Sequence, residues 1–250
     1  MSKVSKWDEL QRSWVIAMKD MKIYYLRPAP IMFGVMFPFT LFLSFAVGRD
    51  VPIAKLAPLL LAQTLFWASS SVGPVSIPVE RRVRTFGRYL SAPLSLVSVL
   101  FGKTLAGVLY GLSISTLAVA LCIFAFGTAI TDAFVLILGM GLASLGFSAM
   151  GIMFASIPTQ NPGEVMMPMN FIRIPMLFIS GLYIPVSQLP TIGQAAAFLS
   201  PLTHTLDLME YGLGGSSHFG IPVNVAVLVL YTLLFIGIGI SFHRRIMKTQ

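Results

Sequence analysis

Three side chains capable of acid–base or metal chemistry, His204, Asp207 and Glu210, follow one another at intervals of three residues. On one helical flank they would bring together an imidazole and two carboxylates, as a metal ion or a proton transfer requires. The rest of the chain supplies no matching pair of ligands, and polar residues on a surface helix are usually solvated. We therefore favour solvated side chains here, and expect no catalytic residue and no metal site.

A second candidate is LFGKT at residues 100–104, which ends like a phosphate-binding loop. That loop needs another glycine about five residues before its lysine, so that backbone N–H groups can surround the phosphates. Residues 97–99 read Val-Ser-Val, so this glycine is missing. We expect no ATP or Mg²⁺ cofactor to bind this chain by that route.

A cluster of fixed positive charge occupies residues 79–95, VERRVRTFGRYLSAPLS, which carry one acid, Glu80, and four arginines: Arg81, Arg82, Arg84 and Arg88. We expect Glu80 near the start of a helix, where exposed backbone N–H groups favour a carboxylate. Such arginines can simply anchor a loop against anionic headgroups. The compact order of an acid, a basic cluster, a break at Gly87 and a return to apolar sequence also predicts a short rigid docking surface.

The composition places these residues in a membrane protein. Of 250 residues, 56% are hydrophobic and 10% are charged, whereas a soluble domain carries about 25% charged residues. One membrane span needs about 20 apolar residues, so this chain can supply about six spans and no large soluble domain. The lone Cys122 lies in an apolar run and is expected to pack there without redox chemistry.

Continuous apolar runs occupy six stretches: about 30–48, 55–78, 96–126, 130–157, 166–186 and 221–242. We therefore expect an all-α, polytopic membrane protein whose residues 30–250 form a domain of six transmembrane helices. Pro168, Pro175 and Pro185 predict a kink or a break in the fifth helix, because each removes a backbone donor.

The basic residues fix the expected orientation. If the N-terminus is cytoplasmic, alternation places 14 of the 17 basic residues inside. They are Lys3, Lys6, Arg12, Lys19, Lys22, Arg27, Arg81, Arg82, Arg84, Arg88, Lys103, Arg244, Arg245 and Lys248. This asymmetry follows the positive-inside tendency and predicts cytoplasmic N- and C-termini. The distribution of these basic residues also argues that the net charge of +8 does not serve to bind nucleic acid.

Residues 1–29 have an amphipathic pattern. Apolar residues recur at steps of three and four: Trp7, Leu10, Trp14, Met18, Met21 and Tyr25. The pattern favours a cytoplasmic helix lying along the membrane surface, with its indole rings at headgroup depth. The alternative is that these residues form the first turns of a tilted first span.

Two further stretches indicate packing elements. Gly107, Gly111 and Ser115 lie four residues apart and allow a second helix to approach closely, either within the chain, which we favour, or in a dimer. Residues 187–220 are too polar to span and too apolar for a disordered loop. We expect two short helices, at 191–199 and 201–213, in a re-entrant or interfacial cap on the extracytoplasmic side.

The stretch VERRVRTFGRYLSAPLSLVSVLFGK, residues 79–103, resembles the first cytoplasmic loop of the membrane (permease) subunits of type-2 ABC exporters. FISGLYIPVSQLPTIGQAAAFLSPLTHTLDLMEYGLGG, residues 178–215, is similar to the segment after the fifth span of that family. The resemblance implies two copies of the chain around a central pathway in the cell (inner) membrane. It also implies that residues 79–95 dock onto two separate ABC-type ATPase subunits, which bind ATP and Mg²⁺.

The resemblance further implies that the second and fifth spans line the pathway. The candidate residues on these spans are Gln63, Trp67, Ser70, Met169, Arg173, Met176 and Phe178. Methionine is flexible and polarizable, which suits cargo of variable shape. A charge at the position of Arg173 costs about 2.5 to 3.5 kcal/mol on insertion scales. It should therefore face water, an acid or anionic cargo, or else snorkel to the inner surface.

The sequence thus predicts an export permease without enzymatic activity of its own, in contact with membrane lipid. Its cargo is expected to be an amphipathic drug-like molecule or lipid, or a lipid-linked polysaccharide. The alternative is a self-contained secondary carrier or channel. A proton-driven carrier should carry acids within its spans, and Asp132 and Glu164 fall only at span ends.

Overall fold

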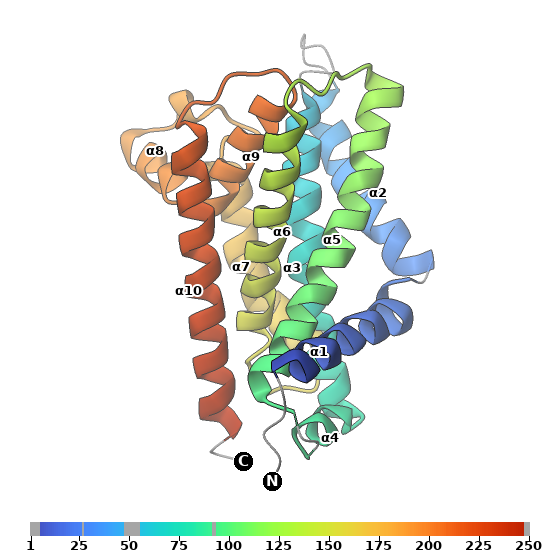
Figure 1. The fold of residues 1–250 in the computed structure, drawn as a ribbon. Coiled ribbons are helices and arrows are strands. Elements are labelled where there is room, and N and C mark those ends of the chain that lie inside the picture. The colour runs from blue at the N-terminus through green and yellow to red at the C-terminus, as the bar shows by residue number, and fades with distance from the viewer. Residues whose placement is uncertain (1–5, 27, 48–55, 92–93, 248–250) are drawn as a thin grey trace.

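The structure is a computed structural model that describes residues 6–26, 28–47, 56–91 and 94–247. All regular secondary structure within these ranges is helical, which confirms the predicted all-α class (Figure 1). The long helices run roughly side by side, and the basic, amphipathic N-terminal helix lies across one end of them (Figure 1).

The helices follow the predicted apolar runs closely. Six are long: α2 (Pro28–Ala46), α3 (Ala57–Arg82), α5 (Leu96–Phe126), α6 (Ala133–Phe154), α7 (Pro162–Ile179) and α10 (Ile221–Met247). The short elements are α1 (Lys6–Asp20), η1 (Met21–Tyr25), α4 (Thr85–Ser91), η3 (Val186–Gln188), α8 (Thr191–Phe198) and α9 (Pro201–Gly212). The two short helices predicted between the fifth and sixth runs are confirmed as α8 and α9.

Three helices among the described residues are long and apolar enough to cross a membrane by themselves: α5, α6 and the 221–246 part of α10. They contain 31, 22 and 26 residues, against about 20 that one crossing needs. Residues 34–44 of α2 form a shorter apolar helix.

Local sequence signals set several helix ends. The Asp132 side chain accepts a hydrogen bond from the N–H of Val135, 3.0 Å away, and so caps the start of α6. The Asn161 side chain caps α7 in the same way through the N–H of Gly163. At the C-terminal end of α5, Gly127 is the cap residue and adopts a φ of 66°. This left-handed conformation is one that glycine adopts readily.

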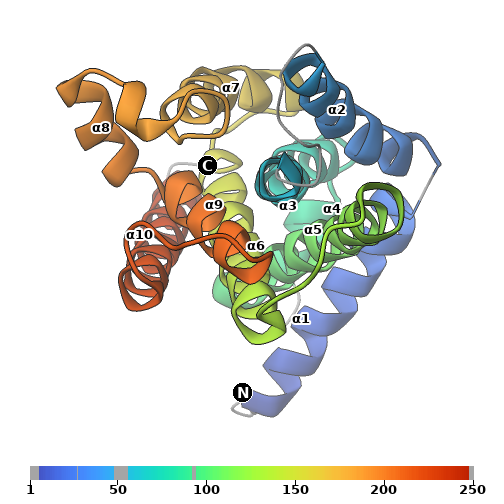
Figure 2. The ribbon, with the colours of Figure 1, turned by 90° about the horizontal axis from the view of Figure 1, so that it is seen from above.

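Helix α3 is the centre of the bundle. It contacts α2, α5, α6, α7 and α9, and the view from above shows it surrounded by neighbours (Figure 2). Helix α10 lies outside this arrangement, where it packs against α6 and α9. A movement of α3 would therefore be transmitted to most of the bundle.

Small residues let the central helices approach closely. A Cβ atom added at Gly111 or Gly107 of α5 would overlap the side chains of Ser69 and Ser148, respectively. A Cβ added at Gly151 of α6 would overlap the backbone carbonyl oxygen of Ser70. The predicted glycine stripe thus packs within the chain, as we favoured.

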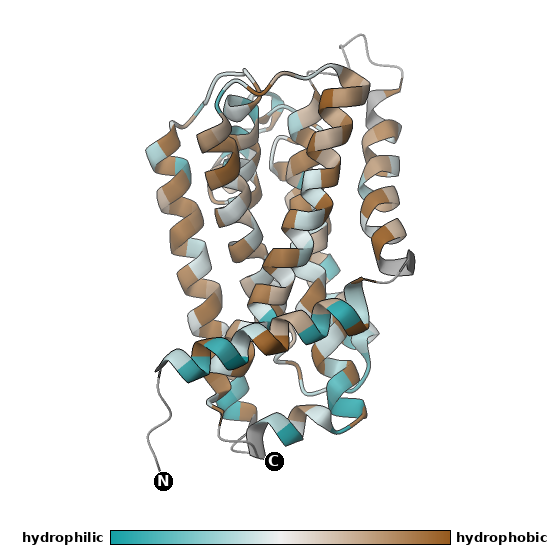
Figure 3. Cartoon of the chain, turned by 45° about the vertical axis from the view of Figure 1, so that its right-hand side comes forward, coloured by the Kyte–Doolittle hydropathy of each residue, from teal (hydrophilic) through white to brown (hydrophobic). Residues whose placement is uncertain are grey.

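Helix α1 lies across the ends of the long helices and packs on α5 (Figures 1 and 3). The Ser13 hydroxyl donates to the carbonyl oxygen of Ser98, 2.8 Å away, and a Cβ at Gly102 would stand 2.6 Å from the Ser13 carbonyl oxygen. Met21 and Tyr25 are buried against the bundle, whereas Trp7, Leu10 and Trp14 are exposed. These exposed apolar side chains are suited to contact a membrane interface.

Two local predictions are wrong. Glu80 does not start a helix, because α3 continues to Arg82 and carries Glu80 in its last turns. Arg81 and Arg82 lie in the last turn of α3, where basic residues interact favourably with the negative end of the helix dipole. Gly87 lies inside α4 and does not break it.

The fifth predicted run, 166–186, is not one continuous helix, and its break lies after Ile179 rather than at Pro168 or Pro175. Helix α7 passes through Pro168 and Pro175 and ends at Ile179, before Pro185.

The close contact at Gly151 makes a stability prediction. Gly151→Ala should lower stability by about 1 to 3 kcal/mol, because a backbone carbonyl cannot move aside as a side chain can. Gly141, on the same helix, is the matched control, since a Cβ there meets nothing within 4 Å. Thermal unfolding of the purified variants in detergent should show a lower Tm for Gly151→Ala alone. Equal Tm values would contradict the packing described here.

Candidate functional site

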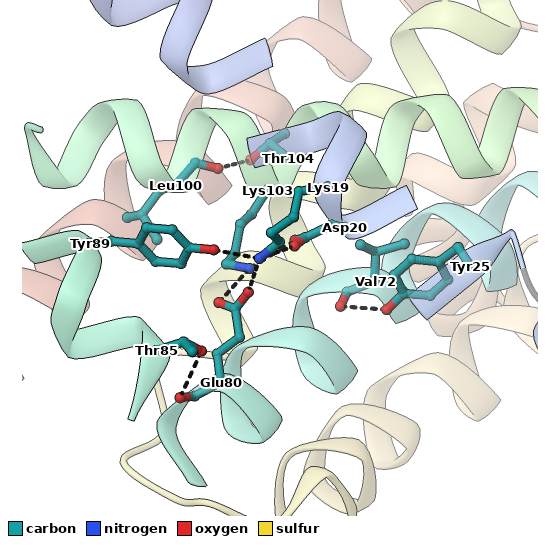
Figure 4. Close-up of polar contacts among 10 residues, drawn as sticks. All are labelled: Lys19, Asp20, Tyr25, Val72, Glu80, Thr85, Tyr89, Leu100, Lys103 and Thr104. Atoms are coloured by element: carbon teal, nitrogen blue, oxygen red, sulfur yellow. Dashed lines mark hydrogen bonds and ion pairs between the residues drawn. The ribbon is translucent and has the colours of Figure 1, made fainter. Parts of the chain in front are cut away.

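Four charged side chains form a buried cluster where α1, α3 and α5 meet (Figure 4). Lys103 Nζ of α5 lies 2.8 Å from Asp20 Oδ2 of α1 and 2.7 Å from Glu80 Oε2 of α3. Lys19 Nζ lies 2.7 Å from Asp20 Oδ1 and donates a hydrogen bond to Glu80 Oε1. Two ammonium groups thus balance two carboxylates.

The cluster also reaches α4. The Lys19 ammonium donates to the hydroxyl oxygen of Tyr89, and it lies 5.0 Å from the centre of that ring (Figure 4). The Thr85 hydroxyl at the start of α4 donates to the carbonyl oxygen of Glu80, 3.3 Å away. Residues from four helices therefore converge on one neutral group of charges.

Burial makes this cluster sensitive to the loss of any member. The side chains of Asp20, Glu80 and Lys103 are at most 1% exposed. Burial by itself lowers the pKa of Lys19, but the Asp20 carboxylate and hydrogen bonds to Asp20, Glu80 and Tyr89 raise that pKa above its ordinary value. Lys19 is therefore charged at neutral pH. An unpaired buried charge is much more costly than a paired one.

The arginines of residues 79–95 divide into two groups. Arg81 is half-buried: it donates to the carbonyl oxygen of Ile157, and its guanidinium lies 5.4 Å from the Phe86 ring centre. Arg82, Arg84 and Arg88 are exposed at the turn between α3 and α4 and on α4 itself. Arg84 has a φ of 57°, a left-handed conformation that favours glycine over other residues.

Three of the predicted pathway residues meet where α3 packs on α7. Arg173 is fully buried, donates from Nη2 to the Ser70 hydroxyl, and lies 5.0 Å from the Trp67 ring centre. Its Nε and Nη1 atoms, and the Nε1 atom of Trp67, make no hydrogen bond to the described part of the chain. Arg173 thus packs against α3 here and is not snorkelling.

The other predicted pathway residues are more scattered. Gln63 is buried, donates to the Pro38 carbonyl oxygen and accepts a hydrogen bond from the Tyr183 hydroxyl at 2.7 Å. Met169 is buried in the apolar core, and Met176 packs against that core. Phe178 is 44% exposed, and its ring lies 5.7 Å from that of Tyr183.

The prediction that His204 and Asp207 are solvated is wrong. Both are buried, because α9 packs against α3, α6 and α10 rather than on a surface. His204 Nδ1 lies 2.7 Å from Asn224 Oδ1, and its Nε2 lies 2.8 Å from the Phe198 carbonyl oxygen. These side chains hold the end of α10 against α9.

Sequence reasoning found Glu80 but missed Asp20, and it did not connect Glu80 with Lys103. Asp20 and Lys103 are 83 positions apart, so no local spacing links them. A signal was present: Lys103 stands in an otherwise apolar run, where an ammonium group needs a partner.

The long apolar helices, with the charged residues gathered at one end of the bundle, are those of an integral membrane protein. The family model of the "ABC-2 type transporter" matches residues 9–213, which is most of the chain. This chain therefore belongs to the ABC-2 type transporter family, a family of membrane components.

Curated relatives share the name nodulation protein J. The chain is 30% identical over 110 residues to that of Rhizobium leguminosarum bv. viciae, covering 44% of this chain and 42% of the relative. It is 26% identical over 170 residues to that of Neorhizobium galegae, covering 65% of this chain and 62% of the relative. In both cases the match spans less than two thirds of the relative.

The charge cluster predicts that one substitution lowers stability strongly and that a second, charge-balancing substitution restores part of the loss. Lys103→Met leaves two carboxylates facing Lys19 alone and should cost about 3 to 5 kcal/mol of stability. Adding Glu80→Gln removes the excess negative charge, so the double variant should recover part of the loss. Thermal unfolding of the three purified proteins measures this, and a Lys103→Met variant as stable as the parent would refute the pairing.

Proposed function

We propose that this chain is the permease subunit of an ATP-driven exporter, working as a dimer with two separate ATPase subunits. One observation carries the proposal: the exposed arginines stand at the end of α3, in the turn after it and on α4, and the buried cluster ties α3 and α4 to α1 and α5. Family membership supports it. The permease needs no nucleotide site of its own under this proposal, because its partner would bind ATP and Mg²⁺.

The proposal includes six membrane spans, formed by α2, α3, α5, α6, α7 and α10. The axes of these six helices are roughly aligned, with the basic α1 and α4 at one end of the bundle and α8 and α9 at the other (Figure 1). Polar residues gather at the α1 and α4 end (Figure 3). The positive-inside tendency makes that end cytoplasmic in the inner membrane, with α8 and α9 as the extracytoplasmic cap.

The proposed coupling step is a displacement of α4. Closure of the ATPase pair would push the surface of Arg82, Arg84 and Arg88. Tyr89 and Glu80 would pass this displacement to Lys19 and Lys103, so that α1, α3, α4 and α5 move together. Because α3 contacts α2, α4, α5, α6, α7 and α9, its tilt would open the pathway alternately to the two sides.

Arg173 is the proposed contact for cargo. The buried Arg173 guanidinium has unused donors and forms no ion pair with an acid among the described residues. Such a charge is costly inside a membrane protein, and this cost points to a functional role. An amphipathic cargo with an anionic group would occupy those donors and lie against the Trp67 ring. A lipid, a drug-like molecule and a lipid-linked polysaccharide all meet this description.

Charge reversal on the docking surface should release the ATPase. We expect Arg82→Glu with Arg88→Glu to reduce copurification of the ATPase subunit at least tenfold, because attraction becomes repulsion. Both positions are exposed, so the fold should be unaffected. Pull-down followed by an ATPase assay measures the loss.

The matched control is Lys22→Glu with Arg244→Glu, which changes the charge equally at two other exposed sites near the same end. Arg84→Gly adds a second test, since glycine suits the left-handed conformation while the charge is lost. An ATPase that stays bound to the Arg82 and Arg88 variant, or leaves both double variants alike, would refute docking at this surface.

Replacing Arg173 should affect function without destabilising the fold. Arg173→Met removes a charge that has no acidic partner among the described residues, so its Tm should match or exceed that of the parent. Cargo-stimulated ATP hydrolysis by the reconstituted complex should fall about tenfold or more, as expected for a charged hydrogen bond of about 1.5 to 3 kcal/mol. Unchanged stimulation would show that Arg173 does not meet cargo.

A further inference from the structure

A cavity of about 550 Å³ lies at the end of the bundle opposite α1 and α4. Its walls come from the start of α3, residues 180–187, α9 and the loop before α10. The volume falls within the range of about 300 to 1,000 Å³ that is usual for small-molecule sites. The coupling step proposed above does not use this cavity.

Asp207 organises one wall of the cavity. Its carboxylate accepts hydrogen bonds from the backbone N–H groups of His218 (2.7 Å) and Phe219 (3.2 Å), from the Ser217 hydroxyl (2.7 Å) and from Asn224 Nδ2 (2.6 Å). Burial raises the pKa of Asp207, but these four bonds outweigh burial and hold the pKa below its usual value. The loop is therefore fixed to α9, with His218 and Phe219 at the cavity.

One buried polar group in the cavity wall, the Thr203 hydroxyl, has no hydrogen-bond partner within the described residues. The Thr203 side chain is 3% exposed. The Glu210 carboxylate, which is partly exposed, lines the same cavity, and burial raises its pKa although the nearby His218 lowers it. A buried polar group without a partner is costly, which points to a ligand that satisfies it.

The lining selects the chemistry of that ligand. Hydroxyls from Thr203 and Ser187, the Glu210 carboxylate and the His218 imidazole offer both donors and acceptors. Phe219 and Tyr183 add aromatic rings, and the leucines Leu56, Leu59 and Leu206 add an apolar surface. No lysine or arginine is among the described lining residues, so an anionic group such as phosphate is not favoured.

We propose that this cavity binds a neutral sugar unit of the exported molecule on the extracytoplasmic side. A sugar presents hydroxyl groups to Thr203, Glu210 and His218 and an apolar face to the rings. The location and the link to export rest on the proposed function. The binding itself does not require an ATPase subunit.

The test uses the full-length chain in lipid nanodiscs, with Cys122→Ser and Ser187→Cys giving one cysteine in the cavity lining. The measured quantity is the rate at which a fluorescent maleimide labels that cysteine, without nucleotide or ATPase. A glucose tetramer or a mannose tetramer should slow labelling severalfold, whereas choline and inorganic phosphate should not. If neither tetramer slows labelling, or if choline or phosphate does so instead, the proposal is wrong.

Thr203→Val in this background removes the unused hydroxyl at nearly constant volume. It should weaken protection by the effective tetramer about threefold to tenfold, which corresponds to one hydrogen bond. Ser200→Ala is the matched control, since its hydroxyl is equally buried and unpartnered but lies outside the cavity. Equal protection in the two variants would overturn the role of Thr203 and with it the assigned site.

A separate measurement determines the side of the membrane from which the cavity cysteine is accessible. In sealed vesicles of known orientation, an impermeant maleimide should label the cysteine only from the extracytoplasmic side. Labelling only from the cytoplasmic side would overturn the proposed orientation, even where the tetramer protects. Loss of ATPase docking, by contrast, would count against the proposed function and leave the nucleotide-free binding measurement unaffected.

Discussion

The structure depends on a balance of charge in the cluster of Lys19, Asp20, Glu80 and Lys103. Each member is costly to bury alone, and together they form a neutral group held by short ion pairs. The constraint is geometric as well as electrostatic, because α1 must lie close to α5 for Asp20 to reach Lys103. Gly102 permits that approach, directly before the lysine that needs it.

This arrangement separates two tasks at the end of the bundle that carries α1 and α4. Buried charges join the helices to one another, while exposed arginines remain available to a partner. Arg81 belongs to the first task, since it holds the α3 end to the Ile157 carbonyl. Under the proposed function, a push on the outer surface therefore acts on a connected unit of four helices and not on a loose loop.

Much of the fold could be predicted because it depends on local patterns. Apolar runs gave the long helices, and prolines and glycines placed α8 and α9 between the last two. Longer-range features could not be predicted in this way. The pairing of Asp20 with Lys103 requires knowing how α1 crosses α5, and the burial of His204 and Asp207 requires knowing that α9 packs inside the bundle. Glu80 was assigned to a helix start because an acid before arginines fits that pattern, whereas its partners lie on other helices.

The most direct test of this account is a pair of spin-label distances in the reconstituted complex, measured with and without ATP. One pair joins Gln11 on α1 to Val83 at the α3 end, and the other joins Val83 to Arg244 on α10, all three positions being exposed. If the cluster makes α1 and α3 one unit, the first distance stays constant while the second changes. A first distance that changes as much as the second would contradict the account.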